Sequence, residues 1–312
     1  MSHIPVLLPE SVKLLLEAPS LTTGGVVVDA TFGGGGHSRA LLQESMEKVT
    51  VIAVDRDPAA VSRARSLLSE FPSRFRLLTG NYADLSRLLI GIGIEHIDGL
   101  LLDIGLSSFQ LEDEERGFSF QSDGPLDMRM DPAVGQPAAE IVNRADVRTL
   151  TRIFRNFGEE PYAAAIARRI VKQRQEAPLR TTRELAGLVE KMVPAYKSSR
   201  RHPATRIFQA LRIVVNDELG ALTQVLECGL EQLGPGGRMV VIAYHSLEDR
   251  IVKRFFRQAA RGCVCPPKVP VCVCGCSPRV KILTGRGQRP TDAEIARNPR
   301  SRSAVLRAVE AL

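Results

Sequence analysis

Three aspartates, Asp29, Asp55 and Asp103, each end an apolar stretch typical of a buried β-strand. Four glycines at residues 33–36 follow the first of them, and a helical pattern begins at Ser38. A parallel α/β sheet uses this order of strand, glycine turn and helix to present a ligand at the carboxyl ends of its strands. These residues therefore predict a ligand site at the carboxyl ends of the strands. The charge of the residues around the glycine turn indicates which ligand the site holds.

Charge distinguishes two candidate ligands. Asp55 lies about twenty residues beyond the glycines, where an acid commonly accepts hydrogen bonds from the hydroxyls of an adenosine ribose. NAD and S-adenosylmethionine both carry that ribose, but the dinucleotide fingerprint expects a third glycine where Ser38 or Arg39 stands. The sulfonium and ammonium of S-adenosylmethionine favour carboxylates such as Asp29 and Asp103, whereas a pyrophosphate disfavours them. The sequence therefore favours S-adenosylmethionine as the ligand. The alternative role for Asp29 is to cap the glycine turn through local hydrogen bonds rather than to bind a ligand.

Strands and helices alternate along the first third of the chain, which predicts a doubly wound, parallel α/β sheet. The predicted strands follow the first at 49–55, 75–79, 97–103 and 237–244, with edge strands at 280–283 and 304–309. More than a hundred residues separate the fourth strand from the fifth, and they carry apolar stripes at helical spacing. We therefore expect a discontinuous sheet domain of residues 1–134 and 211–312, with an all-helical domain inserted at 135–210.

The composition fits a globular protein with a polyanionic partner. The chain has 312 residues and a net charge of +7, with an isoelectric point near 9.3. The first residues lack the profile of a signal peptide, and no apolar run approaches the length of a membrane span. We expect a cytoplasmic protein that does not enter the membrane, and the sequence does not indicate its oligomeric state.

Seven sequence blocks, in order along nearly the whole chain, resemble the RsmH (MraW) family. They are residues 29–38, 103–110, 116–120, 124–131, 202–210, 245–254 and 298–307. The resemblance implies a Rossmann-like, S-adenosylmethionine-dependent methyltransferase domain with a helical insertion that binds substrate. It also implies methyl transfer to N4 of a cytidine in the decoding centre of bacterial 16S rRNA, within the small ribosomal subunit or its precursor.

The same resemblance implies a set of cofactor-binding residues. They are Gly35, Gly36 and His37 in the glycine turn, Asp55 at the ribose, Tyr82 beside the adenine, and Asp103 and Gln110. Phe109 stands where the family is expected to have proline. The replacement is expected to shift the backbone of Gln110, the next residue. The alternative for His37 is a local hydrogen bond at the start of the helix.

Asp103 is the candidate catalytic residue. The amino group of cytosine is a poor nucleophile because its lone pair is delocalised into the ring, so it needs alignment and an acceptor for its N–H. A carboxylate at a strand end suits that task. Asp103 resembles the first acid of the Asp-Pro-Pro-Tyr loop of amino-methyltransferases, although Ser107 and Ser108 do not supply the aromatic side chain of that loop. The alternative is that Asp103 only binds the cofactor.

Candidate substrate-binding residues lie in three places. In the loop of residues 117–131, Asp127 is a candidate acceptor for the cytosine amine and Arg129 a candidate phosphate ligand; the alternative is a structural loop pinned by a salt bridge. His202 and Arg206 lie in a basic cluster, and His245 faces the base or bonds a strand end. The other basic clusters are Arg168, Arg169, Lys172, Arg174, Arg200 and Arg201, and in the tail Lys281, Arg286, Arg289, Arg297, Arg300 and Arg302. They predict phosphate contacts, with a solvated surface as the alternative for each.

Five of the six cysteines gather in one tail segment. Cys263, Cys265, Cys272, Cys274 and Cys276 form a candidate zinc site, although their Cys-x-Cys spacing differs from the usual Cys-x-x-Cys, and reduced thiols are the alternative. Two other functions remain as hypotheses. One is an NAD-dependent oxidoreductase, and the other is a non-catalytic ribosome-assembly factor that binds RNA and keeps a vestigial cofactor site.

Overall fold

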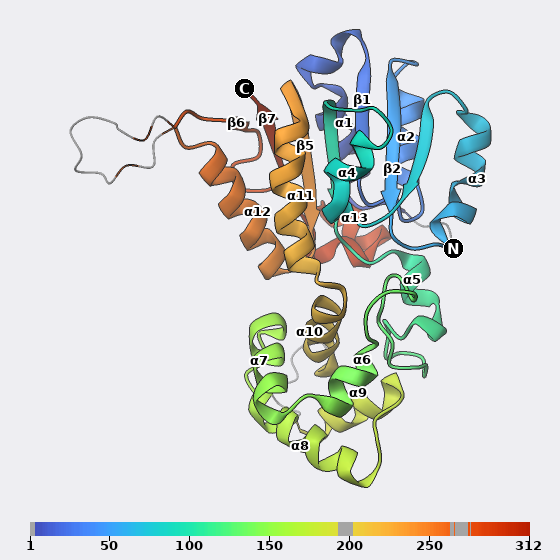
Figure 1. The fold of residues 1–312 in the computed structure, drawn as a ribbon, viewed down its shortest axis with the longest axis vertical. Coiled ribbons are helices and arrows are strands. Elements are labelled where there is room, and N and C mark those ends of the chain that lie inside the picture. The colour runs from blue at the N-terminus through green and yellow to red at the C-terminus, as the bar shows by residue number, and fades with distance from the viewer. Residues whose placement is uncertain (1–3, 193–201, 263–264, 266–273, 275) are drawn as a thin grey trace. The chain divides into compact units, whose positions relative to one another are not determined.

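The computed structural model describes residues 4–192, 202–262, 265, 274 and 276–312 (Figure 1). The chain divides into two compact units, one of residues 1–105 and 219–312 and the other of residues 106–218. Within the described part of the chain, no helix combines the length and the apolar character that crossing a bilayer demands.

The first unit contains a seven-stranded sheet in the order β3-β2-β1-β4-β5-β7-β6. The strands are β1 (Gly25–Asp29), β2 (Val49–Asp55), β3 (Phe75–Thr79), β4 (Ile97–Asp103), β5 (Leu233–Ala243), β6 (Val280–Ile282) and β7 (Val305–Ala311). β1 to β5 are parallel, and β7 runs antiparallel to both of its neighbours. This arrangement confirms the predicted Rossmann-like α/β fold.

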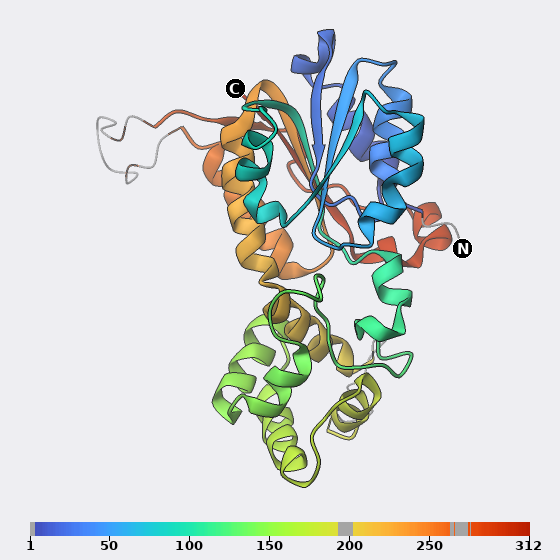
Figure 2. The same cartoon turned by 45° about the vertical axis from the view of Figure 1, so that its right-hand side comes forward.

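Helices cover both faces of the sheet. One face carries α1 (Leu8–Leu16), α2 (Gly36–Glu44) and α3 (Ala60–Glu70), and the other carries α4 (Leu85–Ile90), α11 (Glu218–Gln232) and α12 (Ser246–Ala259), as Figure 2 shows. Successive strand residues point to opposite faces, so Val27 packs with the first set of helices and Val28 with the second. Both faces are therefore buried, which explains the unbroken apolar runs of the strands.

Strand register brings the three strand-end aspartates to one edge of the sheet. Asp29 pairs with Ala53 of β2 and with Leu101 of β4, two residues short of the last residue of each strand. Because β1, β2 and β4 are parallel neighbours, Asp29, Asp55 and Asp103 all lie at the carboxyl edge.

Some element boundaries differ from those that the sequence predicts. β5 begins at Leu233 rather than 237. β7 is an interior strand, paired with β5 on one side and with the true edge strand β6 on the other. The remaining short elements of this unit are α13 (Asp292–Arg297) and three 3-10 turns at Pro19–Thr23, Tyr82–Asp84 and Pro299–Ser303.

The second unit is helical. Its elements are α5 (Ser108–Glu112), a 3-10 turn (Glu114–Arg116), α6 (Ala138–Arg144), α7 (Val147–Gly158), α8 (Ala163–Glu176), α9 (Thr182–Glu190) and α10 (Ala204–Asn216). Its limits of 106–218 are wider than the 135–210 that we expect from the sequence. The reason is that Phe118, Leu126 and Met128, from the loop before α6, are buried in the same core as the helices.

Candidate active site

The glycine turn after β1 is too tight for larger residues. Gly35 has φ +76° and directly precedes the first residue of α2, and a Cβ on it would lie 2.7 Å from the ring of Phe32. A Cβ on Gly36 would lie 2.2 Å from the Pro5 ring. The turn therefore needs glycine for both its conformation and its packing.

Asp29 holds this turn together. Its carboxylate is buried and accepts hydrogen bonds from the Ser38 hydroxyl at 2.7 Å and from the Thr31 backbone N–H at 3.2 Å. Burial raises the pKa of Asp29 above its usual value, against the opposing effects of His37 and these hydrogen bonds. The contacts support the interpretation of Asp29 as a turn cap.

Asp55 organises the end of β2. Its two oxygens accept hydrogen bonds from the backbone N–H groups of Gly33 and Asp57, each at 2.9 Å. The guanidinium of Arg63 lies 3.9 Å away and donates instead to the Gly33 carbonyl at 2.7 Å. Burial raises the pKa of Asp55, and the backbone N–H groups and Arg63 oppose that rise. The carboxylate retains lone pairs for further donors.

Asp103 has a partly buried hydrogen-bond donor that sequence analysis missed. The hydroxyl of Tyr244 donates to Asp103 Oδ1 at 2.8 Å, and the Asp103 backbone N–H donates to the Thr31 hydroxyl at 2.7 Å. Burial, followed by the charge of Asp103, raises the pKa of Tyr244 well above its usual value, so the phenol keeps its proton. The sequence feature that could have indicated Tyr244 as a site residue is its position just after β5, beside the candidate residue His245.

His37 lies between two of these carboxylates in the first unit. Its Nδ1 is 3.9 Å from Asp103 Oδ2, and burial lowers its pKa although Asp29 and the Val6 carbonyl oppose that effect. Its buried Nε2 has no hydrogen-bond partner among the described residues. The glycine turn, Asp55, His37 and Asp103 thus converge at one sheet edge.

The remaining two predicted cofactor residues lie in different units. Tyr82, in the 3-10 turn after β3, is partly buried against the core of the first unit. Gln110 belongs to the second unit, where its side chain accepts a hydrogen bond from the Ser107 N–H at 3.3 Å and the Ser107 hydroxyl accepts one from the Gln110 N–H. Their roles at a cofactor stay predictions.

In the second unit, Asp127 and Arg129 bind each other. Arg129 donates from Nε to Asp127 Oδ1 at 2.8 Å and from Nη2 to Oδ2 at 2.7 Å. Asn216 of α10 holds the loop on both sides of Arg129, because its side-chain amide accepts from the Met130 N–H and donates to the Met128 carbonyl. The geometry favours the interpretation of a loop pinned by a salt bridge.

His202 and Arg206 lie at the start of α10. The His202 ring packs on Phe120, with 4.6 Å between ring centroids, and its Nδ1 accepts a hydrogen bond from the Ala204 N–H. Arg206 is 55% exposed and lies 3.9 Å from buried Glu160. Both residues stay candidates for substrate contact; Arg200 and Arg201 lie outside the described residues.

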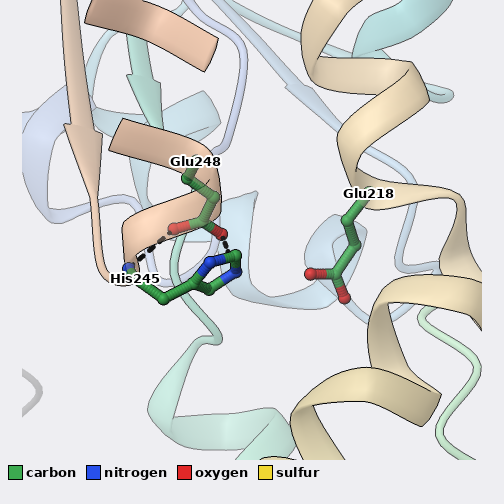
Figure 3. Close-up of side chains that lie close together, drawn as sticks. All are labelled: Glu218, His245 and Glu248. Carbon is green, nitrogen blue, oxygen red and sulfur yellow. Dashed lines mark hydrogen bonds and ion pairs between the residues drawn. The ribbon is translucent and has the colours of Figure 1, made fainter. Parts of the chain in front are cut away.

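His245 follows β5 in the first unit, where Glu248 fixes it. Glu248 Oε2 accepts hydrogen bonds from the backbone N–H groups of Tyr244 at 2.8 Å and His245 at 3.1 Å, and Oε1 lies 2.9 Å from His245 Nε2 (Figure 3). Of the two alternatives for His245, these contacts support the anchoring of a strand end. Glu218, also drawn in Figure 3, accepts two hydrogen bonds from Arg212 within the second unit, each at 2.8 Å.

The candidate zinc site is only partly described. Cys263 and Cys272 lie outside the described residues, whereas Cys265, Cys274 and Cys276 belong to them. Within the described ranges, no cluster of three candidate metal ligands includes a cysteine. The zinc site stays a prediction.

The comparison with known families is decisive. The model of the MraW methylase family matches residues 1–312. The chain belongs to the MraW methylase family.

Relatives of this MraW-family chain match it over nearly their whole length. A ribosomal RNA small subunit methyltransferase H from Thermomicrobium roseum is 55% identical over 99% of this chain and 93% of its own. Proteins of the same name from Syntrophotalea carbinolica and Geobacter sulfurreducens are 52% and 50% identical, over at least 98% of each chain. A SAM-dependent O-methyltransferase structure from Thermotoga maritima aligns with a TM-score of 0.41 at 10% identity, over 99% of this chain and 67% of that one.

Proposed function

We propose that this protein transfers a methyl group from S-adenosylmethionine to N4 of a cytidine in the decoding centre of 16S rRNA, within the small ribosomal subunit or its precursor. Membership of the MraW methylase family and the names of its relatives support a methyltransferase that acts on small-subunit rRNA. The family resemblance of the sequence supplies the N4 position and the decoding centre.

The site suits S-adenosylmethionine on three observations. The Gly35–Gly36 turn lets backbone approach a ligand, Asp55 keeps lone pairs for ribose hydroxyls, and the buried Nε2 of His37 lacks a partner among the described residues. The hydrogen-bond donors of Asp29, Asp55 and Asp103 are neutral hydroxyl and backbone N–H groups, and the Arg63 guanidinium lies 3.9 Å from Asp55 without donating to it. A bound cation would therefore add to the compensation of these carboxylates. S-adenosylmethionine supplies a methyl group on a positively charged sulfur.

Asp103 has the position of a proton acceptor. As the amino nitrogen of cytosine bonds to the methyl carbon, the carbon–sulfur bond breaks and its electrons stay on sulfur. The nitrogen then loses one proton. Asp103 accepts that N–H hydrogen bond and then the proton, while Tyr244 holds Oδ1 and His37 Nδ1 lies 3.9 Å from Oδ2. The single observation that carries this role is the hydrogen bond from Tyr244 to Asp103.

The second unit contributes substrate contacts in this proposal. Exposed Arg206 binds phosphate, and His202, stacked on Phe120, lies beside the RNA. Asp127 and Arg129 shape the loop through their mutual salt bridge. Asp127 would contact the base, and Arg129 the phosphate, only after that salt bridge opens. His245 contributes by fixing the end of β5.

A transfer assay tests the proposal. The protein is incubated with methyl-labelled S-adenosylmethionine and either small-subunit particles or naked 16S rRNA. Label should enter RNA with the wild type and be lost with Asp103→Ala, and the better substrate shows whether the assembled particle is recognised. Cofactor binding without label in either RNA would contradict the proposal and support the assembly-factor hypothesis. Retention of NAD rather than S-adenosylmethionine would support the oxidoreductase hypothesis.

A further inference from the structure

One long segment of the chain has no acidic residue. Residues 250–291 contain ten lysines and arginines but no aspartate or glutamate, although the whole chain has 35 acidic residues among 312. Such a run of one charge repels itself in the folded protein. A negatively charged partner would relieve that repulsion, so the arrangement of these cations in the fold is informative.

Helix α12 places its cations on one side. Arg250, Lys253, Arg254 and Arg257 are spaced at 3, 4 and 7 residues from the first, which is the spacing of one helical face, and exposed Arg261 follows just after the helix ends at Ala259. The opposite face is buried through Val252 and Phe256. The two acids of this helix point elsewhere, because Glu248 is buried and Asp249 pairs with Arg307 of β7.

The edge strand β6 extends the same charge. The backbone N–H of Arg279 donates to the carbonyl of Ala259 at 2.8 Å, so the residues leading into β6 lie beside the end of α12 (Figure 1). Arg279 and Lys281 are exposed there. An uncovered edge strand with lysine and arginine also resists pairing with another strand.

We infer that the α12–β6 surface, defined by Lys253, Arg254, Arg257, Arg261, Arg279 and Lys281, binds the phosphate backbone of small-subunit rRNA. Within the part of the chain that the structure describes, none of these six side chains forms an ion pair. Cations that extend from α12 through Arg261 to a neighbouring strand match a line of phosphates better than a single small anion. The inference rests on the proposed function for the identity of the RNA.

The test compares two triple variants in the full chain. Lys253→Gln, Arg254→Gln and Arg257→Gln remove three charges of the α12–β6 surface. The control, Lys13→Gln, Arg65→Gln and Arg76→Gln, removes three exposed charges from α1, α3 and β3. Binding to naked 16S rRNA and to small-subunit particles is measured over a series of salt concentrations, with urea unfolding and affinity for S-adenosylmethionine as checks on the fold.

We expect the surface variant to bind both RNAs about tenfold more weakly near 0.1 M salt, with a log–log salt slope shallower by about 2 to 3, because each phosphate contact contributes about 0.9. The control should keep the wild-type slope. Equal affinity and slope in the two triple variants would overturn the inference. The inference would also be overturned if the surface variant lost affinity only for small-subunit particles and not for naked 16S rRNA, because that result would identify a ribosomal protein as the partner. RNA binding by the wild type without methyl transfer would instead refute the proposed function alone.

Discussion

Asp29 and Asp55 of the sheet unit and Asp127 of the helical unit are held in opposite ways. In the sheet unit, Asp29 and Asp55 are buried at strand ends and accept hydrogen bonds from hydroxyl and backbone N–H groups, and their pKa values are raised by burial. In the helical unit, burial would also raise the pKa of Asp127, but the hydrogen bonds of Arg129 outweigh it and lower that pKa. Asp29 and Asp55 thus accept hydrogen bonds from neutral donors, with Arg63 3.9 Å from Asp55, whereas Arg129 neutralises Asp127 directly.

This difference separates a ligand site from a structural device. A carboxylate that is already paired bidentately with an arginine gains little from a new cation, and breaking the pair is costly. A strand-end carboxylate that is held by neutral donors attracts a positively charged ligand. We therefore propose that the cofactor binds in the sheet unit and that Asp127 shapes a loop.

The largest effect is expected from Asp103→Asn. Loss of the proton acceptor should lower kcat for methyl transfer about 100-fold or more while the affinity for S-adenosylmethionine changes less. Tyr244→Phe is the matched variant, which keeps the carboxylate and removes one hydrogen bond, and it should lower kcat less than about tenfold. Transfer rates and calorimetric cofactor affinity would be measured together. Normal turnover in Asp103→Asn would remove this residue from the mechanism.

Asp55→Ala should weaken cofactor binding. The loss of hydrogen bonds to a charged acceptor corresponds to about 1.5–3 kcal/mol, or about 10- to 150-fold in Kd. Calorimetry with S-adenosylmethionine measures it, and Glu44→Gln, an exposed charge change in the same unit, should leave Kd unchanged. If Asp127→Asn weakened cofactor binding as strongly as Asp55→Ala, the proposal that the cofactor binds in the sheet unit would be contradicted.

Asp127→Asn should instead destabilise the helical unit by about 1 kcal/mol, because the pair with Arg129 is partly exposed. The lowered pKa means that this stabilisation is present above the unfolded pKa near 3.8 and is lost as pH falls through the folded value. Hydrogen exchange of residues in α6 and α10 measures it by unit. Glu115→Gln serves as an exposed control, and an effect of equal size there would contradict the structural role.

The smallest effect is expected from Asp29→Asn, and its pH dependence has the opposite sign. Because the folded pKa is raised, the wild type loses stability as pH rises from the unfolded value of 3.8 through the folded value. The variant should therefore gain stability relative to the wild type across that window, by under about 1 kcal/mol, since the Ser38 and Thr31 hydrogen bonds offset part of the cost of burial. Urea unfolding at several pH values measures the difference. A difference independent of pH would contradict the buried, weakly compensated carboxylate.

Local patterns predicted the elements that long apolar runs define. β2 and β4 end at Asp55 and Asp103 as predicted, because buried parallel strands are continuous in apolar residues. The early start of β5 was missed because Gly234, Pro235 and Gly236 are typical of a turn. The interior place of β7 depends on pairing across the sheet, which its own residues do not encode.

Side-chain partners were the least predictable part of the site. Tyr244 reaches Asp103 across 141 residues of sequence, so no local pattern indicates the hydrogen bond. Asp127 and Arg129 were placed in one loop with a salt bridge as one alternative, and the fold shows that they pair, with Met128 between them in the left-handed conformation at φ +65°. A sequence shows which residues carry charge, whereas the fold decides which of those charges are already neutralised.

The identity of the methylated nucleoside tests the central claim most directly. Small-subunit RNA would be digested to nucleosides after reaction with isotopically labelled S-adenosylmethionine, and the products separated by chromatography and mass spectrometry. We predict label in N4-methylcytidine with the wild type and none with Asp103→Ala. Label in a 2′-O-methyl or C5-methyl nucleoside would contradict N4 transfer, and the absence of label despite cofactor binding would contradict the assignment of the strand-end carboxylates to methyl transfer.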